Sequence, residues 1–176
     1  MKDQNMEGSI QVYYGEGGGK TTAALGLGIR AAGIGKQVIM VQFLKCKHSD
    51  TLDFLKKLEP ELQIFRFAKA ACAYSDMDEE ERQEQLSNIR MALGYTRKVL
   101  DTGQCDLLIL DEIFGLIDYN IITMDDLREL LAAKDESTDL ILTGRNLPEE
   151  VRELADCIYY IHTEKEQAGE ILSADR

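Results

Sequence analysis

Apolar residues along the chain gather in short runs, and stretches with helical spacing separate these runs. Three of the runs are nearly continuous, which is typical of strands covered on both faces in a parallel sheet. Another run alternates with polar residues, so we expect that strand to be less buried. The predicted strands, from first to last, are residues 9–14, 38–44, 62–67, 107–110, 139–143 and 157–162.

Helical spacing of apolar residues, together with capping and terminating residues, predicts the intervening helices. The longest has an acidic first turn, and Ser75-x-x-Asp78 resembles a capping box before it. Strands and helices that alternate in this way predict an α/β fold, a single domain with a mostly parallel sheet flanked by helices. The predicted helices are residues 20–32, 51–58, 78–103, 123–131 and 149–154, and the polar residues 163–176 are expected to form a frayed tail.

A glycine-rich loop lies between the first predicted strand and the first predicted helix. Glycine permits positive φ and lets backbone N–H groups approach phosphate oxygens, while the helix start adds donors and the positive end of a dipole. Strand, loop, Lys-Thr and helix in this order are the context of a phosphate-binding loop, which predicts a P-loop NTPase architecture of RecA-like type. The predicted nucleotide-binding residues in it are Gly15, Glu16, Gly17, Gly18, Gly19, Lys20, Thr21 and Thr22.

The loop is one residue shorter than the general P-loop template, because Tyr14 stands where the template has its first glycine. We expect the shorter loop to change how phosphates sit, so ordinary hydrolysis of a γ-phosphate does not follow from it. Lys20 would supply a positive charge to the phosphates, and the Thr21 hydroxyl would ligate Mg²⁺. The structural alternative is a chance glycine turn, which four glycines in five residues before Lys-Thr make unfavourable.

Two acidic residues, Asp111 and Glu112, directly follow the aliphatic run at 107–110. In doubly wound sheets ligands bind at the carboxyl ends of the strands, so Asp111 or Glu112 is predicted to hold Mg²⁺ directly or through water. Two solvent-exposed acids in a turn are the structural alternative. Arg145 stands at the end of a later strand and is predicted to reach a phosphate. A surface arginine beside a turn is an equal alternative for that position.

The net charge of −12 over 176 residues argues against a nucleic-acid-binding surface. No apolar run approaches the ~20 residues of a membrane span and no signal-peptide stretch is present, so we expect no membrane partner and a cytoplasmic location. The four cysteines form no Cys-x-x-Cys pair, which predicts reduced, mostly buried thiols rather than a zinc or redox site. His162 has no catalytic partner nearby in the sequence, so we expect it to be structural.

Together these motifs resemble those of the P-loop ATP:corrinoid adenosyltransferases, the cob(I)alamin or cob(I)yrinic acid a,c-diamide adenosyltransferases. That family has the same short loop, written Gly-x-Gly-Lys-Gly-Lys-Thr-Thr, and this point separates it from generic NTPases. Its Val-Gln-Phe-x-Lys, Leu-Asp-Glu, Thr-Gly-Arg and Glu-Leu-Ala-Asp motifs match residues 41–45, 110–112, 143–145 and 153–156. The order and spacing of the motifs fit from residue 9 to residue 161.

The resemblance implies that reduced cobalt attacks the 5′ carbon of ATP, which lies reversed relative to ordinary P-loop enzymes, and that triphosphate leaves. It implies ATP and a corrinoid as substrates, Mg²⁺ held by Thr21, Asp111 and Glu112, an electron donor for the cobalt, and a homodimer. Lys20 and Glu112 are then the catalytic residues, because a leaving triphosphate needs cations and donors rather than a water-activating base.

The chain departs from the family pattern at three places. Gly18 replaces the loop lysine, residues 68–74 replace the Gly-Phe-Thr-Trp stretch that packs on the corrin, and the C-terminal Lys-His and Ala-Gln-x-Gly motifs are not recognisable in residues 164–176. Two other hypotheses therefore stay open. One is a P-loop ATPase or kinase that would release ADP, and the other is a non-catalytic ATP-binding paralogue that has lost corrinoid binding.

Overall fold

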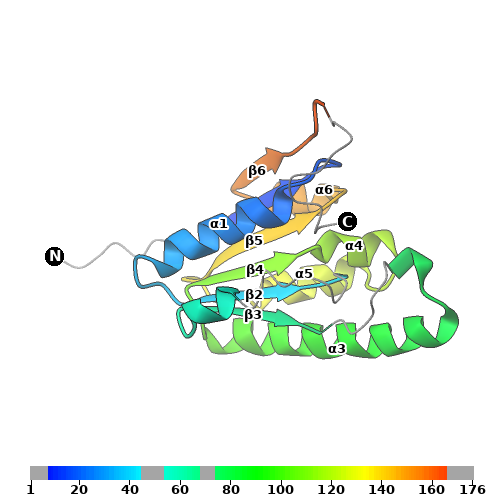
Figure 1. Ribbon diagram of the computed structural model, residues 1–176, viewed down its shortest axis with the longest axis horizontal. Coiled ribbons are helices and arrows are strands. Elements are labelled where there is room, and N and C mark those ends of the chain that lie inside the picture. The colour runs from blue at the N-terminus through cyan, green and yellow to red at the C-terminus, as the bar shows by residue number, and fades with distance from the viewer. Residues whose placement is uncertain (1–7, 45–53, 68–73, 166–176) are drawn as a thin grey trace.

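The computed structural model describes residues 8–44, 54–67 and 74–165 (Figure 1). Three expectations fall at least partly outside these ranges: the start of the helix predicted at 51–58, most of the irregular stretch at 68–74, and the tail beyond residue 165.

One parallel sheet of six strands runs through the molecule in the order β3-β2-β4-β5-β1-β6. The parallel α/β fold predicted from the apolar runs is confirmed. The second strand ends two residues earlier than predicted, where Leu44 has a left-handed φ of 54°, and the last strand also ends two residues early. The strands are β1 (Ile10–Tyr14), β2 (Val38–Gln42), β3 (Leu62–Arg66), β4 (Leu107–Asp111), β5 (Asp139–Gly144) and β6 (Cys157–Tyr160).

Helices connect the strands. The predicted N-terminal cap of the longest helix, α3, is wrong. The capping box of α3 is built by Asp78 and Glu81, whose side chains each accept a hydrogen bond from the other's backbone N–H, whereas Ser75 lies in the separate 3₁₀ turn η2. Thr123 caps α5 as predicted. The helices are α1 (Lys20–Ala32), η1 (Lys56–Leu58), η2 (Tyr74–Asp76), α3 (Glu79–Thr102), α4 (Ile113–Asp118), α5 (Met124–Ala132) and α6 (Glu149–Leu154), of which α4 was not predicted.

Apolar side chains cover both faces of the sheet, as the continuous runs predicted. Along β4, Leu107 and Ile109 belong to the core beneath α1, while Leu108 and Leu110 belong to the larger core beneath α3, α4, α5 and α6. Figure 1 shows α1 over one face and α3 with α5 on the other, and Leu58 of η1 also packs on the face that α1 covers. The alternation follows from the two-residue period of a strand, which turns successive side chains to opposite faces of the sheet.

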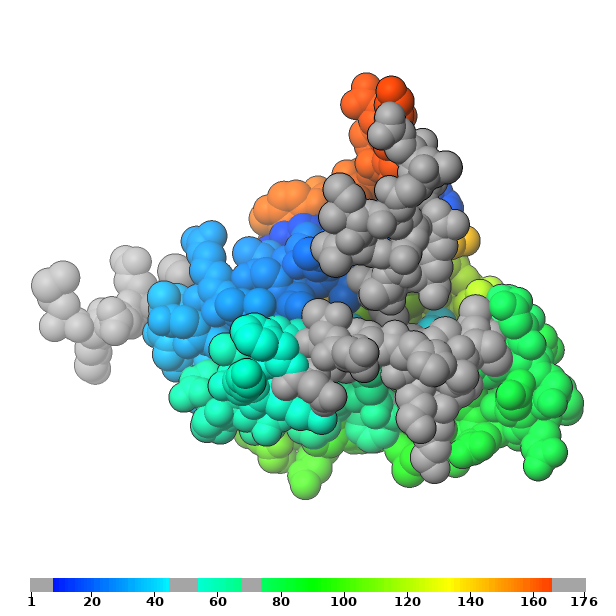
Figure 2. Space-filling model, viewed as in Figure 1, coloured from blue at the N-terminus to red at the C-terminus, as the bar shows by residue number. Residues whose placement is uncertain are grey.

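The edge strand β6 is far less buried than the inner strands. Tyr159 and Tyr160 are 45% and 59% exposed, and in Figure 2 the orange atoms of β6 lie at the outer margin of the molecule. Tyr159 stacks on Tyr13 of β1, and Tyr160 stacks on His162, so His162 has the structural contact expected of it.

The cysteines in the described part of the chain, Cys105 and Cys157, are both free, and they differ in burial. Burial raises the pKa of Cys105 to about 12, which makes it an unreactive thiol. Cys157 is exposed on β6, so the expectation of mostly buried thiols is wrong for this residue. Within the described residues, no helix is long and apolar enough to cross a membrane.

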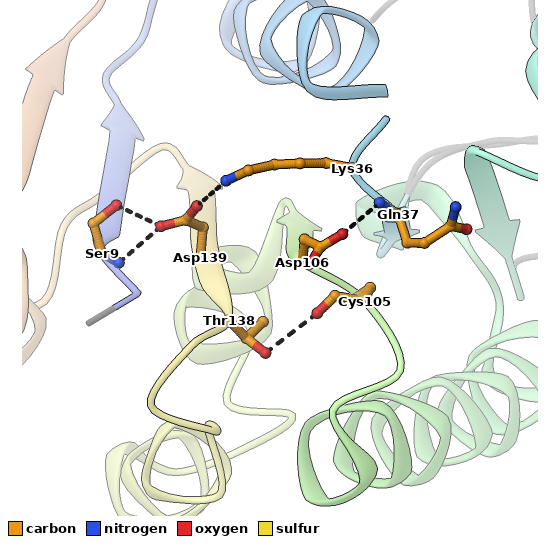
Figure 3. A network of polar contacts seen from close by, with 7 residues as sticks. All are labelled: Ser9, Lys36, Gln37, Cys105, Asp106, Thr138 and Asp139. Carbon is orange, nitrogen blue, oxygen red and sulfur yellow. Dashed lines mark hydrogen bonds and ion pairs between the residues drawn. The ribbon is translucent and has the colours of Figure 1, made fainter. Parts of the chain in front are cut away.

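Polar contacts tie the strands together at their amino ends (Figure 3). The Asp139 carboxylate accepts hydrogen bonds from the Ser9 backbone N–H at 2.9 Å, the Ser9 hydroxyl at 3.0 Å and the Lys36 ammonium at 2.9 Å. Burial works to raise the pKa of Asp139, but the bonds from Lys36 and Ser9 outweigh it and hold the pKa below its ordinary value of 3.8. This carboxylate therefore fixes the start of β5 to the residue before β1 and to the loop before β2.

We predict that Asp139→Asn lowers the free energy of unfolding by about 1–2 kcal/mol at neutral pH, because it removes a charged hydrogen-bond acceptor that is partly buried. The folded pKa lies below the unfolded one, so the contribution is fully present above pH 3.8 and is lost as the pH falls through the folded pKa. Urea unfolding at a series of pH values should show the difference from wild type narrowing in acid. As a control, Asp101→Asn in the exposed pair with Arg97 should change stability by less than about 0.5 kcal/mol.

Candidate nucleotide-binding site

The candidate residues meet at the carboxyl edge of the sheet, because every strand runs in the same direction. The glycine loop follows β1, the acidic pair Asp111 and Glu112 closes β4, and Arg145 follows β5. β5 lies between β1 and β4, and α1 begins at this edge, where its Thr21 hydroxyl lies 3.0 Å from an Asp111 carboxylate oxygen.

The glycine loop has one side fixed against the protein and one side open. Gly15 has a φ of +126°, and a Cβ built on it would lie 2.1 Å from the backbone oxygen of Ile161. A Cβ on Gly17 would lie 2.7–2.9 Å from backbone atoms of His162 and Thr163. By contrast, a Cβ on Gly18 or Gly19 would have no heavy atom within 4 Å. The residues after β6 thus support the loop from behind, and its exposed glycines leave room for a ligand.

Two backbone hydrogen bonds hold this arrangement. The Gly15 N–H donates to the Arg145 carbonyl at 3.0 Å, and the Gly17 N–H donates to the Ile161 carbonyl at 3.1 Å. Gly19 then occupies the N-cap position of α1 with a φ of 98° and makes no side-chain cap. The first N–H groups of a helix have no acceptor within the helix, so the start of α1 presents donors suited to an anion.

Lys20 lies over the loop that it follows. Its ammonium donates to the carbonyl oxygens of Gly15 at 2.7 Å and Gly17 at 2.8 Å. The positive charge predicted for this site is therefore held at the mouth of the loop by the loop's own backbone.

The Asp111 carboxylate is held by side chains from several elements. It has no exposed surface, and the Thr21 hydroxyl lies 3.0 and 3.1 Å from its two carboxylate oxygens. The Thr143 hydroxyl donates to one oxygen at 2.7 Å, and the Gln42 amide donates to the other at 2.9 Å. Gln42 in turn accepts a hydrogen bond of 2.6 Å from Nε of Arg66. Helix α1 and strands β2 and β5 therefore converge on one carboxylate, and β3 is linked to it through Gln42.

Gln42, Arg66 and Thr143 were not predicted as site residues, although two of them lie in motifs quoted above. A signal for them exists only once the strands are paired. Gln42 is in register with both Arg66 and Asp111, and Thr143 comes one residue after Leu142, which is in register with Leu110.

Glu112 and Arg145 lie beside this centre in different settings. Glu112 is the N-cap residue of α4, has a left-handed φ of 62°, and donates its backbone N–H to the Thr143 hydroxyl at 2.8 Å. Arg145 pairs with Glu16 of the loop at 3.3 Å, and both side chains are more than 60% exposed. Arg145 is thus at the loop, bound to an acid, and Thr22 is exposed on the first turn of α1.

The oxygen donors at this edge suit a hard cation such as Mg²⁺. Thr21 contributes a hydroxyl and Asp111 a carboxylate within hydrogen-bond distance of each other, and Glu112 is the next residue. Mg²⁺ is usually held by one or two carboxylates together with substrate phosphates and waters, so a set of this size fits. No group of three or more His, Cys, Asp or Glu side chains that could hold a metal occurs among the described residues, so an all-protein cage is absent there.

Comparison with known proteins points in one direction. A family model described as ATP:corrinoid adenosyltransferase BtuR/CobO/CobP matches residues 6–175. The chain is 30% identical to a corrinoid adenosyltransferase of Escherichia coli K12 over 155 residues, which cover 88% of this chain and 76% of that protein. It is 28% identical to the corrinoid adenosyltransferase CobA of Salmonella typhimurium LT2 over the same shares of the two chains.

The fold also resembles a solved structure with lower sequence similarity. A KaiC-like protein of Pyrococcus horikoshii OT3 superposes with a TM-score of 0.56 at 18% identity, covering 90% of this chain and 75% of that one. This likeness concerns the fold alone, and it agrees with the RecA-like P-loop architecture predicted from the loop.

The two sides of the glycine loop give a matched pair of substitutions. We predict that Gly17→Ala lowers the free energy of unfolding by about 2 kcal/mol, since its Cβ would strike backbone atoms that cannot move cheaply. Gly18→Ala should change it by less than about 1 kcal/mol, because that Cβ enters open space. Urea unfolding of both variants measures the difference, and equal losses would contradict the described support of the loop.

Proposed function

We propose that this chain, which belongs to the ATP:corrinoid adenosyltransferase family, transfers the 5′-deoxyadenosyl group of ATP to the cobalt of a reduced corrinoid and releases triphosphate. The observation that carries the proposal is the family match over residues 6–175. The geometry supports it, because the loop that separates this family from generic NTPases forms a glycine cradle with an open side.

The reaction makes triphosphate the leaving group, and the developing charge on it is what the protein must stabilise. In our proposal the loop and the start of α1 bind the triphosphate, and Lys20 turns its ammonium from the loop carbonyls to the phosphate oxygens. Arg145 contributes from the opposite side of the loop, where Glu16 now holds it. The nucleophile is the cobalt of the substrate, so no side chain has to act as one.

Thr21, Asp111 and Glu112 would hold Mg²⁺ in this proposal, as the oxygen donors at the strand ends allow. When bound, the cation neutralises charge on the phosphates. Thr21 keeps its position because its hydroxyl is bound to the buried Asp111, and Asp111 keeps its position through Thr143 and Gln42. Glu112 is partly buried at the N-cap of α4, where its backbone is fixed by Thr143.

Other parts of the proposal rest on the family alone. Cobalt must arrive reduced, so an electron donor is required, and the family resemblance also implies a homodimer. A cytoplasmic location stays a prediction from the sequence. The stretch that would pack on the corrin, residues 68–74, falls almost entirely outside the described residues.

The decisive assay mixes the protein with ATP, Mg²⁺ and chemically reduced cobalamin. We expect a light-sensitive alkylcobalamin spectrum and one triphosphate per adenosyl group transferred. ADP as the product would favour the ATPase or kinase alternative, and ATP binding without turnover would favour the non-catalytic alternative.

Lys20→Ala should abolish both ATP binding and the reaction, because it removes the cation at the mouth of the loop. Isothermal titration with ATP measures the binding directly. Lys134→Ala, at a partly exposed lysine just after α5 whose ammonium donates to the Asp135 carbonyl, should leave the affinity unchanged. Retained affinity in Lys20→Ala would contradict the assignment of the loop.

Gly18 stands where the family has a lysine, and the space around it is open. We predict that Gly18→Lys tightens ATP binding about 3- to 10-fold at low salt, because it adds a positive charge beside the phosphates, and that the gain shrinks as salt rises. Gly18→Ala is the uncharged control and should show no gain. A gain that is equal in both variants, or independent of salt, would contradict the placement of phosphate at this side of the loop.

A further inference from the structure

A row of polar side chains crosses four neighbouring strands at the carboxyl edge of the sheet. Its members are Arg66 on β3, Gln42 on β2, Asp111 on β4 and Thr143 on β5. On each strand the residue two positions earlier is apolar and packs in or against the core beneath α1: Ile64, Met40, Ile109 and Ile141. The polar row is therefore the last set of side chains, at the carboxyl ends of the strands, on the face of the sheet that α1 covers.

Hydrogen bonds join this row without a break. Arg66 Nε donates to the Gln42 side-chain carbonyl at 2.6 Å, Gln42 Nε2 donates to Asp111 at 2.9 Å, and Thr143 donates to Asp111 from the other side at 2.7 Å. Gln42 is only 3% exposed, so its amide has little access to water. An arginine can only donate and a carboxylate can only accept, so this pair of neighbours fixes which end of the Gln42 amide faces each of them.

We propose that Gln42 and Arg66 are positioning residues for the metal–nucleotide site, an inference that rests on the proposed function. Gln42 holds the Asp111 carboxylate in the orientation that binds Thr21, from which Asp111 would help to hold the cation. Arg66 holds Gln42 and polarises its amide, which strengthens the bond to Asp111.

The chemistry of an amide suits this place better than a second charge. A guanidinium bound directly to Asp111 would neutralise the carboxylate and weaken its attraction for Mg²⁺. A neutral amide supplies the hydrogen bond that a buried carboxylate needs and leaves the negative charge available to the cation. Gln42 thus keeps the positive charge of Arg66 one side chain away from the metal site.

The inference is tested by the ratio of ATP affinity with Mg²⁺ to ATP affinity in EDTA, measured by isothermal titration. For Gln42→Met we expect this ratio to fall about 10- to 100-fold, as for other residues that orient a metal ligand, while affinity in EDTA stays within about 3-fold. Arg66→Met, at a half-buried position that tolerates change better, should lower the ratio about 3- to 10-fold. Gln63→Met and Arg97→Met are the matched controls and should leave the ratio unchanged.

The double variant tests whether the two residues act in series. Because Arg66 acts through Gln42, adding Arg66→Met to Gln42→Met should lower the ratio no further. If the effects of the two substitutions on the ratio multiply in the double variant, Arg66 does not act through Gln42 and the proposal is overturned. The proposal is also overturned if Gln42→Met or Arg66→Met lowers the stability to urea but leaves the ratio of the folded protein unchanged. Failure of the proposed function is seen separately, because wild-type protein would then form no alkylcobalamin with ATP, Mg²⁺ and reduced cobalamin, whatever the ratio in the variants.

Discussion

A fully buried carboxylate, Asp111, is the constraint on which the site depends. A buried charge is strongly unfavourable unless hydrogen bonds replace the water that it has lost. Here the donors come from α1, β2 and β5, through Thr21, Gln42 and Thr143. Each of these donors sits on a different element, so the carboxylate is satisfied only when the helix after the glycine loop and the inner strands are all in their native places. The hydrogen bonds that stabilise the buried charge are thus the same contacts that bring the site residues together.

The parallel sheet makes this convergence possible. Strands that run in one direction bring all their carboxyl ends to one edge, and their registers place Arg66, Gln42 and Asp111 side by side. The opposite edge carries the contacts of Asp139, which are structural. Because the strands are parallel, the structural contacts gather at their amino ends and the candidate binding residues gather at their carboxyl ends.

The features of this molecule that could be predicted are those that depend on residues close together in the sequence. The apolar runs gave the strands, and the glycines with Lys20 gave the loop, because strand period and loop chemistry are local. Gln42 and Thr143 were missed as site residues since their role depends on which strands are neighbours, and strand order is not a local property. The capping box of α3 was misplaced by three residues, because both Ser75 and Asp78 fit the cap position and only the chain's path chooses between them. The exposure of Cys157 was missed for a related reason, since an edge strand differs from an inner one only by its neighbours.

The glycine loop packs against the residues that follow the edge strand β6. The loop runs close to the residues that follow β6, and only glycine fits at positions 15 and 17, where a Cβ would meet that backbone. The support behind the loop comes therefore from β6, the most exposed strand, and it acts through backbone contacts that do not depend on side-chain identity. On the open side, a Cβ at position 18 would meet no heavy atom within 4 Å, so this position can accept residues other than glycine. A loop built in this way separates the residues that keep its shape from the residue that can tune its charge, and Gly18 is one of the three places where this chain departs from the family pattern.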